Sequence, residues 1–224
     1  MSYLETQVLA QIQNLQQQIA SLLLYQSVLK KTVGEAFIKL LESLSKKDVI
    51  AIECLRAYGN WFRTLASKNI SWQEYLICQI IQDDNPFSQQ VQKIDITNLS
   101  PNLIAGAKHD LQILHNLYQC SSKTIAKWVK TIAKLEKDPI AWELQSEIKE
   151  PIYQKLRNLE HWPDSIEILA THYRHFGIGL FAESIAFEWR NGQLLPINYP
   201  DSVKLKELVG YEFQRDTLIK NTEF

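Results

Sequence analysis

Cysteine, glycine and proline are scarce in this sequence of 224 residues. The three cysteines, Cys54, Cys78 and Cys120, match no zinc-ligand spacing, and their odd number argues against a disulfide framework. We therefore expect buried free thiols in a reducing cytoplasm. Only seven glycines and seven prolines favour long regular elements over elaborate loops.

Long hydrophobic runs, a signal-peptide pattern and a charge excess are missing too. No apolar run approaches the roughly 18 residues of a membrane span, and the first residues show neither a basic region nor an A-x-A-like cleavage site. The formal net charge of −1 gives no overall field toward nucleic acid or membrane. These absences predict a cytoplasmic protein without membrane attachment, and they disfavour a nucleic-acid partner.

What the sequence does contain is helical periodicity, which predicts a mainly α fold: a multi-helix bundle with one short β-hairpin near residues 186–197. Asn191-Gly192 between apolar residues is the hairpin signal. Ser71 and Glu74 predict a capping box. We expect helices over 3–30, 33–45, 49–67, from Ser71 to the turn at 83–88, 100–118, 121–137, 139–162, and from Asp164 to Gly177. The predicted helical domain covers 1–183, followed by a hairpin and linker over 184–200.

The first predicted helix carries an a/d heptad pattern with one polar interruption. One interpretation is a coiled-coil arm that pairs with another subunit. The other is a helix packed on its own domain, because neighbouring leucines widen the apolar stripe. The pattern consists of Val8, Ile12, Leu15, Ile19, Leu22, Gln26 and Leu29.

A row of lysines follows at spacings of four and three, which predicts five ammonium groups on one helix face. One interpretation is a ridge for phosphates or for an acidic protein surface. The other, which we favour, is a solvated face whose lysine stems cover apolar surface. The row consists of Lys123, Lys127, Lys130, Lys134 and Lys137.

Two pairs of potential metal ligands occur, but neither pattern predicts a metal site. Asp83 and Asp84 are adjacent near a turn, where carboxylates commonly cap or face solvent, and no third ligand lies nearby in the sequence. His172 and His175 have an i, i+3 spacing, but no local Cys, Asp or Glu completes a site. We expect no catalytic residue and no metal in this chain.

Residues 201–224 contain L-K-E-L-V-G-Y-E-x-Q-R-x-x-L-I-x-N-T-E, which resembles the segment that opens the ATPase module of AAA-type ATPases. The chain is similar to an uncharacterised bacterial family that places an all-helical N-terminal domain before that module. Four further stretches carry this resemblance: R-A-Y-G-N-W-F-R at 56–63, W-Q-E-Y-L at 72–76, D-D-N-P-F-S at 83–88 and H-Y-R-H-F-G-I-G-L-F-A at 172–182.

The resemblance implies that Val209, Gly210 and Tyr211 form the adenine side of a nucleotide pocket. Phosphate binding needs G-x-x-x-x-G-K-[ST], which these 224 residues lack. Because a helix begins before Phe224 without an end signal, we expect the module to be truncated before that motif. ATP and Mg²⁺ are then expected only for a full-length protein, and the chain as given is expected not to be an enzyme.

Three functions are open at this point. The first is a non-catalytic N-terminal domain of a AAA-type ATPase that binds a protein partner or positions a substrate. The second is a stand-alone helical scaffold that self-associates through the heptad helix. The third, which has the least support, is a helical enzyme or metalloprotein that uses Asp83, Asp84, His172 or His175.

Overall fold

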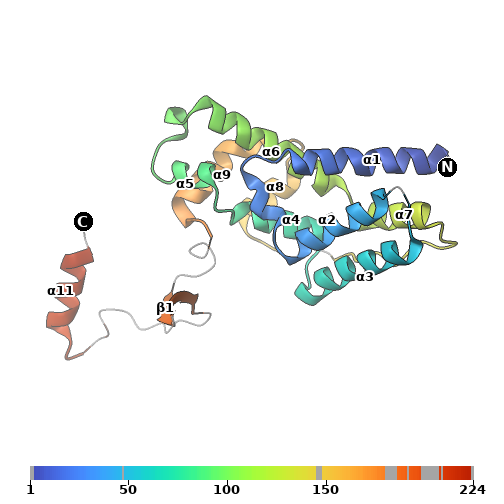
Figure 1. The fold of residues 1–224 in the computed structure, drawn as a ribbon. Helices are drawn as coiled ribbons and strands as arrows, with labels where there is room; N and C mark the ends of the chain where they lie inside the picture. The colour runs from blue at the N-terminus through green and yellow to red at the C-terminus, as the bar shows by residue number, and fades with distance from the viewer. Residues whose placement is uncertain are drawn as a thin grey trace. The chain divides into compact units, whose positions relative to one another are not determined.

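The computed structural model of the chain describes residues 3–46, 48–144, 148–179, 186–190, 192–197, 207 and 209–222. These residues form a mainly α fold with a single two-stranded hairpin, as predicted (Figure 1). The helices are α1 (Tyr3–Ala20), η1 (Tyr25–Leu29), α2 (Thr32–Ser45), α3 (Ala51–Lys68), α4 (Trp72–Ile81), α5 (Pro86–Val91), η2 (Ile96–Asn98), α6 (Pro101–Gln119), α7 (Ser122–Ala133), α8 (Pro151–Asn158), η3 (Trp162–Ser165), α9 (Ile166–Phe176) and α11 (Glu212–Thr222). The strands are β1 (Phe187–Arg190) and β2 (Gln193–Pro196).

The chain divides into two compact units, Met1–Ala182 and Glu183–Phe224. The first unit holds α1 to α9 and the hydrophobic core. The second unit holds the hairpin and α11.

The prediction of one helix over 3–30 was wrong, because α1 ends at Ala20 and the short 3₁₀ helix η1 follows. The buried carboxylate of Asp110, on α6, accepts hydrogen bonds from three successive backbone N–H groups. They come from Leu23 (3.0 Å to each oxygen), Leu24 (2.6 Å) and Tyr25 (2.8 Å). In a continued α-helix these N–H groups would bond to carbonyls four residues earlier. A residue far away in the sequence thus ends the helix.

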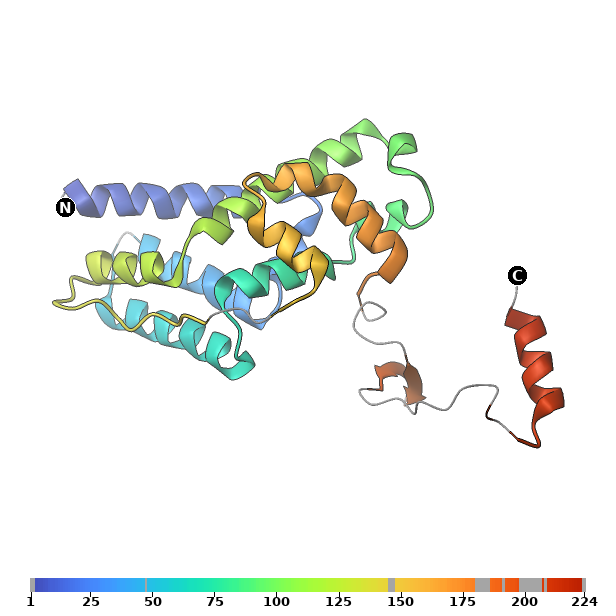
Figure 2. The same ribbon diagram turned by 180° about the vertical axis from the view of Figure 1, so that it is seen from behind.

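The heptad residues of α1 face the chain's own core. Val8, Ile12 and Leu15 are buried, as are Leu22 and Leu29 beyond the helix end. The helix packs on α2, α6 and α7 (Figures 1 and 2). Of the two interpretations of the pattern, the structure shows the helix packed on its own domain.

A cluster of aromatic rings joins α2, α3 and α4 in the core. The ring centroids of Phe37 and Trp72 lie 4.3 Å apart, and those of Trp61 and Trp72 lie 6.0 Å apart. Trp72 Nε1 donates to the Leu117 carbonyl at 3.0 Å, whereas the buried Trp61 Nε1 has no hydrogen-bond partner among the described residues. The predicted capping box holds α4 in place, since Ser71 and Glu74 bond reciprocally at 3.1 and 2.7 Å.

Gly34, in the first turn of α2, permits a close backbone contact with η1. A Cβ atom at this position would lie 2.5 Å from the Leu29 carbonyl oxygen, well inside van der Waals contact. The Gly34 N–H donates to the Tyr75 hydroxyl, which in turn donates to the Val28 carbonyl at 2.6 Å. η1, α2 and α4 therefore meet at one tightly packed point.

Two predicted helices were wrong in extent. α7 ends at Ala133, because Lys134 adopts a left-handed conformation with φ of 54°. Residues 138–144 and 148–150 are not helical, and among the described residues of the predicted range 139–162 the only α-helix is α8. The non-helical segment lies along α3, where the Tyr58 hydroxyl donates to the Ile140 carbonyl and Trp142 Nε1 donates to the Ile70 carbonyl.

The second unit contains the predicted hairpin. Arg190 pairs with Gln193, and Phe187 pairs with Pro196, so the connecting turn has two residues. Gly192 has φ of 79°, as such a turn requires, while Asn191 lies outside the described residues. α11 starts after a turn at Val209 and Gly210.

Candidate partner-binding surface

The predicted lysine row lies on α7 and on the segment that follows it. Ser121 caps the helix by accepting a hydrogen bond from the Thr124 N–H at 3.1 Å. The apolar side of α7 is buried, with Ile125 and Val129 fully covered against the neighbouring helices α1, α2 and α3. The lysines of α7 are Lys123, Lys127 and Lys130.

The five lysines do not form one helix face as predicted. Lys123, Lys127 and Lys130 lie on α7, Lys134 is its C-cap, and Lys137 lies beyond the helix. The cause is the left-handed Lys134, whose N–H donates to the Lys130 carbonyl and turns the chain out of the helix.

Three of these lysines form ion pairs within the chain. The Nζ atom of Lys123 lies 2.6 Å from a carboxylate oxygen of Glu143, and that of Lys130 lies 2.9 Å from one of Asp138. The Nζ atom of Lys134 lies 3.4 Å from a carboxylate oxygen of Glu5 on α1. Lys127 and Lys137 have no ion pair with any residue that the structure describes. The row is therefore partly neutralised by the chain itself.

A pocket of about 720 Å³ lies between α1 and α7. Apolar side chains from both helices line it, including the nearly buried Trp128 and the 58 % exposed Leu4. Lysines 127, 130 and 134 also line it, whereas Lys123 does not. The complete lining is Leu4, Glu5, Val8, Thr124, Lys127, Trp128, Lys130, Thr131, Lys134, Leu135 and Asp138.

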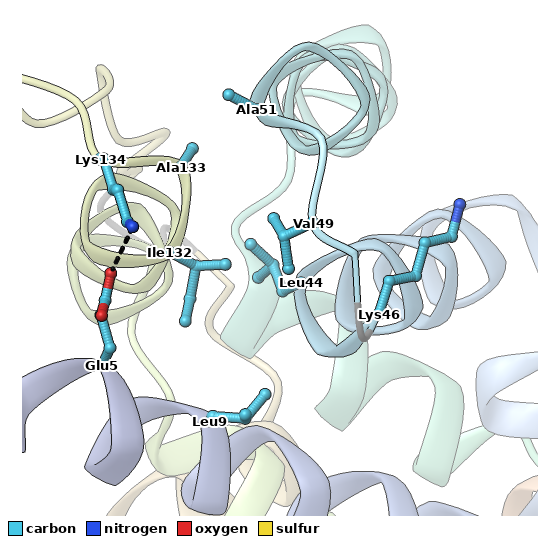
Figure 3. Close-up of a pocket in the computed structure, with 9 residues that line it drawn as sticks. All are labelled: Glu5, Leu9, Leu44, Lys46, Val49, Ala51, Ile132, Ala133 and Lys134. Atoms are coloured by element: carbon cyan, nitrogen blue, oxygen red, sulfur yellow. Dashed lines mark ion pairs between the residues drawn. The ribbon is translucent and has the colours of Figure 1, made fainter. Parts of the chain in front are cut away.

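A second pocket, of about 340 Å³, shares Glu5 and Lys134 with the first (Figure 3). The Glu5–Lys134 ion pair stands at one side of it, and Leu44, Val49 and Ile132 form apolar walls from three different segments. The side chain of Glu5 is only 13 % exposed, whereas that of Lys134 is 77 % exposed. The ion pair therefore joins the N-terminal part of α1 to the end of α7 between two pockets.

This arrangement offers apolar surface beside ammonium groups that remain in water. Such a surface suits a ligand that is apolar on one side and acidic on the other. We name the 720 Å³ pocket and its lysine edge the α1–α7 groove. The sequence indicated its lysines, but not Leu4 or Val8, because only the packing of α1 on α7 brings them there.

Asp83 and Asp84 point in different directions. Asp83 is buried, and it accepts hydrogen bonds from the Ser27 hydroxyl and from Asn85 Nδ2 (2.6 Å). Burial raises the pKa of the Asp83 carboxyl above its usual range. Asp84 is exposed and accepts from Gln89 Nε2 at 2.8 Å. The two carboxylates therefore bind the chain's own polar groups.

The two histidines of α9 also have separate roles. The His172 ring stacks on Phe176 with centroids 5.0 Å apart, and burial lowers its pKa. His175 Nδ1 lies 2.8 Å from the Thr171 carbonyl oxygen. Within the described residues, no group of three or more His, Cys, Asp or Glu side chains is arranged to hold a metal ion.

The stretches 83–88 and 172–179, which both carry the family resemblance, are neighbours in the fold. The Gly179 N–H donates to the Gln82 carbonyl at 2.9 Å, and the Phe87 and Tyr173 rings meet edge to face. The buried Tyr173 hydroxyl donates to the Ile80 carbonyl. Sequence reasoning missed these contacts, because their residues come from distant elements. The two hydrogen bonds and the ring contact all join parts of this chain, so they stabilise the fold.

The predicted adenine wall forms a surface turn in the second unit. Val209 is 85 % exposed and Tyr211 is 60 % exposed. Gly210 has φ of 82°, and its N–H donates to the Glu212 carboxylate at 3.1 Å. The turn thus presents apolar side chains to solvent directly before α11.

The remaining sequence expectations concern thiols and membranes. The three cysteines carry free thiols, and Cys54 is fully buried as expected, whereas Cys78 and Cys120 are only half-buried. In the part of the chain that the structure describes, no helix combines the length and the apolar character needed to cross a membrane.

Comparison with known proteins identified no relative of the chain. No protein-family model, no curated protein and no solved structure matches the chain. The likeness to AAA-type ATPases therefore rests on the sequence stretches alone.

Proposed function

We propose that this chain is a non-catalytic protein-interaction domain that binds its partner through the α1–α7 groove. The observation that carries the proposal is the pocket itself, in which Trp128, Val8 and Leu135 lie beside three lysines. Apolar anchors next to exposed cations are the usual elements of a selective protein contact.

The second part of the proposal is that the domain precedes an ATPase module of the AAA type and positions its partner for it. The support is the resemblance of residues 205–223 and the four further stretches. The exposed turn at Val209 and Tyr211 is compatible with a surface that a following module would cover. ATP and Mg²⁺ would be bound by that module and not by the helical body.

The coding sequence downstream of residue 224 tests the ATPase part. We expect a G-x-x-x-x-G-K-[ST] loop within about 30 codons, since this loop supplies the phosphate-binding N–H groups and lysine. A reading frame without that loop removes the ATPase part and leaves the interaction part standing. Calorimetry of the present chain should show no heat of ATP binding.

Site-specific crosslinking tests the interaction part. A photoreactive amino acid at Leu4, in the groove, is compared with one at Gln13, on the exposed side of the same helix. We expect one defined crosslinked protein from position 4 and none from position 13. The partner, once identified and purified, should bind the chain in calorimetry. Equal crosslinking from both positions contradicts the proposal.

Self-association is the alternative, and one observation favours it. Ile50 and Ile52, at the start of α3, are more than half exposed, as are Tyr3 and Leu4 of α1. Exposed apolar side chains that form one contiguous patch mark a contact surface. Sedimentation equilibrium of the wild type and of Ile52→Asp tests this function. A dimer that dissociates in the variant supports it, and a monomer in both rejects it.

A further inference from the structure

The lysines along the α1–α7 groove have a regular spacing. Lys127 and Lys130 are one turn apart on α7, and Lys134 follows at its end. Seven residues of α-helix span about 10 Å at a rise of about 1.5 Å per residue. The groove therefore offers cations over about two helical turns and not at a single point.

An apolar floor lies beside these cations. Trp128 and Val8 are largely buried and form the inner part, while Leu4 is exposed at the edge. Leu135, from the turn after α7, completes the apolar lining. A ligand in this groove can bury apolar groups while its flank meets the lysines.

The chain's own carboxylates hold the two paired lysines differently. Both side chains of the Lys130–Asp138 pair are more than a third exposed, and such a surface pair contributes about 0–1 kcal/mol, so a ligand carboxylate can replace Asp138 at little cost. Lys134 keeps its pair with Glu5, whose side chain is only 13 % exposed, but its own side chain is 77 % exposed and can meet a second carboxylate. Lys127 forms no ion pair with any described residue, so a ligand carboxylate can pair with it without displacing one of those residues.

We propose that the groove binds an acidic amphipathic helix of a partner protein. Its carboxylates would recur at i, i+3 or i+4, and i+7, opposite Lys127, Lys130 and Lys134, with leucine-like side chains on the adjoining face. This proposal deepens the proposed protein-interaction function and rests on it. A small amphipathic anion would use one lysine, whereas the row matches charges repeated along a helix.

Selection from a displayed library of helical peptides, about 16 residues long, tests the proposal without a known partner. Peptides are selected on the wild-type chain and counter-selected on Leu4→Ser. We expect the enriched sequences to share three acidic residues at the stated spacing and an apolar stripe. Enriched peptides without acidic residues overturn the proposal, because apolar contact alone would then explain binding.

The strongest peptide is then synthesised, and its affinity for four variants is measured by calorimetry. Lys127→Glu should weaken binding about fivefold, because an attraction becomes a repulsion. Asp138→Asn should strengthen it about twofold by releasing Lys130. Leu4→Ser should weaken it about tenfold through lost apolar contact. Lys123→Gln, on the same helix but outside the groove, is the matched control and should leave the affinity unchanged.

The results separate the two proposals. If Leu4→Ser weakens the peptide and Lys127→Glu does not, the acidic helix is rejected and the interaction function stands. If a saturated fatty acid such as dodecanoate displaces the peptide at equal concentration, the groove is a small-molecule site and the acidic helix is rejected. If no groove-dependent peptide is enriched and Leu4 gives no crosslink, both proposals fail.

Discussion

The two ends of α1 are held by interactions of the same chemical kind but of different strength. At its C-terminal end, a buried carboxylate, Asp110, binds three backbone N–H groups of the residues that follow the helix. At its N-terminal end, Glu5, whose side chain is 13 % exposed, pairs with Lys134, whose side chain is 77 % exposed, between two pockets. Hydrogen bonds to a buried charge contribute about 1.5–3 kcal/mol each, whereas water around an exposed ammonium weakens its ion pair. The comparison shows that one helix can be fixed at one end and open to partners at the other.

The largest expected effect comes from removing the charge at the fixed end. Asp110→Asn replaces one acceptor oxygen by an NH₂ group that faces backbone N–H donors, so at least one buried donor loses its partner. We expect the free energy of unfolding to fall by about 3 kcal/mol. Urea denaturation followed by circular dichroism measures the change.

Asp138→Asn is the matched control for a carboxylate in an exposed ion pair, because it also converts one carboxylate to an amide. Its ion pair with Lys130 is exposed, and we expect a change below about 0.5 kcal/mol. Similar losses in the two variants would show that burial does not set the strength of these carboxylate contacts.

A second effect concerns two tryptophans in the same ring cluster. Trp72 Nε1 donates to the Leu117 carbonyl, whereas Trp61 Nε1 has no partner among the described residues. Both side chains are fully buried, so Trp→Phe removes similar apolar area at each position. We expect Trp72→Phe to lose about 1 kcal/mol more than Trp61→Phe. Thermal and urea unfolding of both variants measure the difference, and the reverse order contradicts the hydrogen-bond argument.

A third effect is the pH dependence of stability. His115 stacks on Trp162, and burial, together with the nearby His161, lowers the pKa of His115 below its usual value of 6.5. The unfolded chain then binds more protons than the folded one, so the free energy of unfolding falls as the pH drops through about 6.5. His115→Phe should reduce this slope.

Urea titrations between about pH 7.5 and 5.5 measure that slope in both proteins. Burial raises the pKa of Asp83, which contributes a slope of the opposite sign. Because this contribution is common to both proteins, the difference between them reports His115. Identical slopes would mean that His115 does not titrate differently in the folded state.

The smallest effect is a difference in labelling among the three thiols. Cys54, in the first turn of α3, donates through Sγ to the Ser43 carbonyl. Burial raises the pKa of Cys78 and of Cys120 to about 11 and also raises that of Cys54. We expect all three to react slowly with iodoacetamide, with Cys54 last, because its side chain is fully buried whereas Cys78 and Cys120 are half-buried. Mass spectrometry of digests gives the order, and first labelling of Cys54 contradicts it.

Signals contained in a few neighbouring residues predicted local structure well. The Ser71–Glu74 capping box and the hairpin around Gly192 are both present, because each depends on residues within one turn. The end of α7 has no such signal, since Lys134 takes a left-handed conformation that glycine or asparagine would have announced.

Features set by distant residues were not predictable. The break after Ala20 depends on Asp110, and nothing in Leu22-Leu23-Leu24-Tyr25 marks it. The same holds for the groove. Its lysines lie in one short segment, but Leu4 and Val8 reach it only because α1 packs on α7.

The Asp110 contact has a consequence for synthesis of the chain on the ribosome. Its hydrogen bonds join positions 85 to 87 residues apart, so residues 23–25 have no partner carboxylate until α6 has been made. Until then, local preference favours helix beyond Ala20, through the leucines. We therefore expect the nascent chain to carry a longer first helix, which is shortened when α6 emerges. The order in which the segments appear thus gives the first helix two successive lengths.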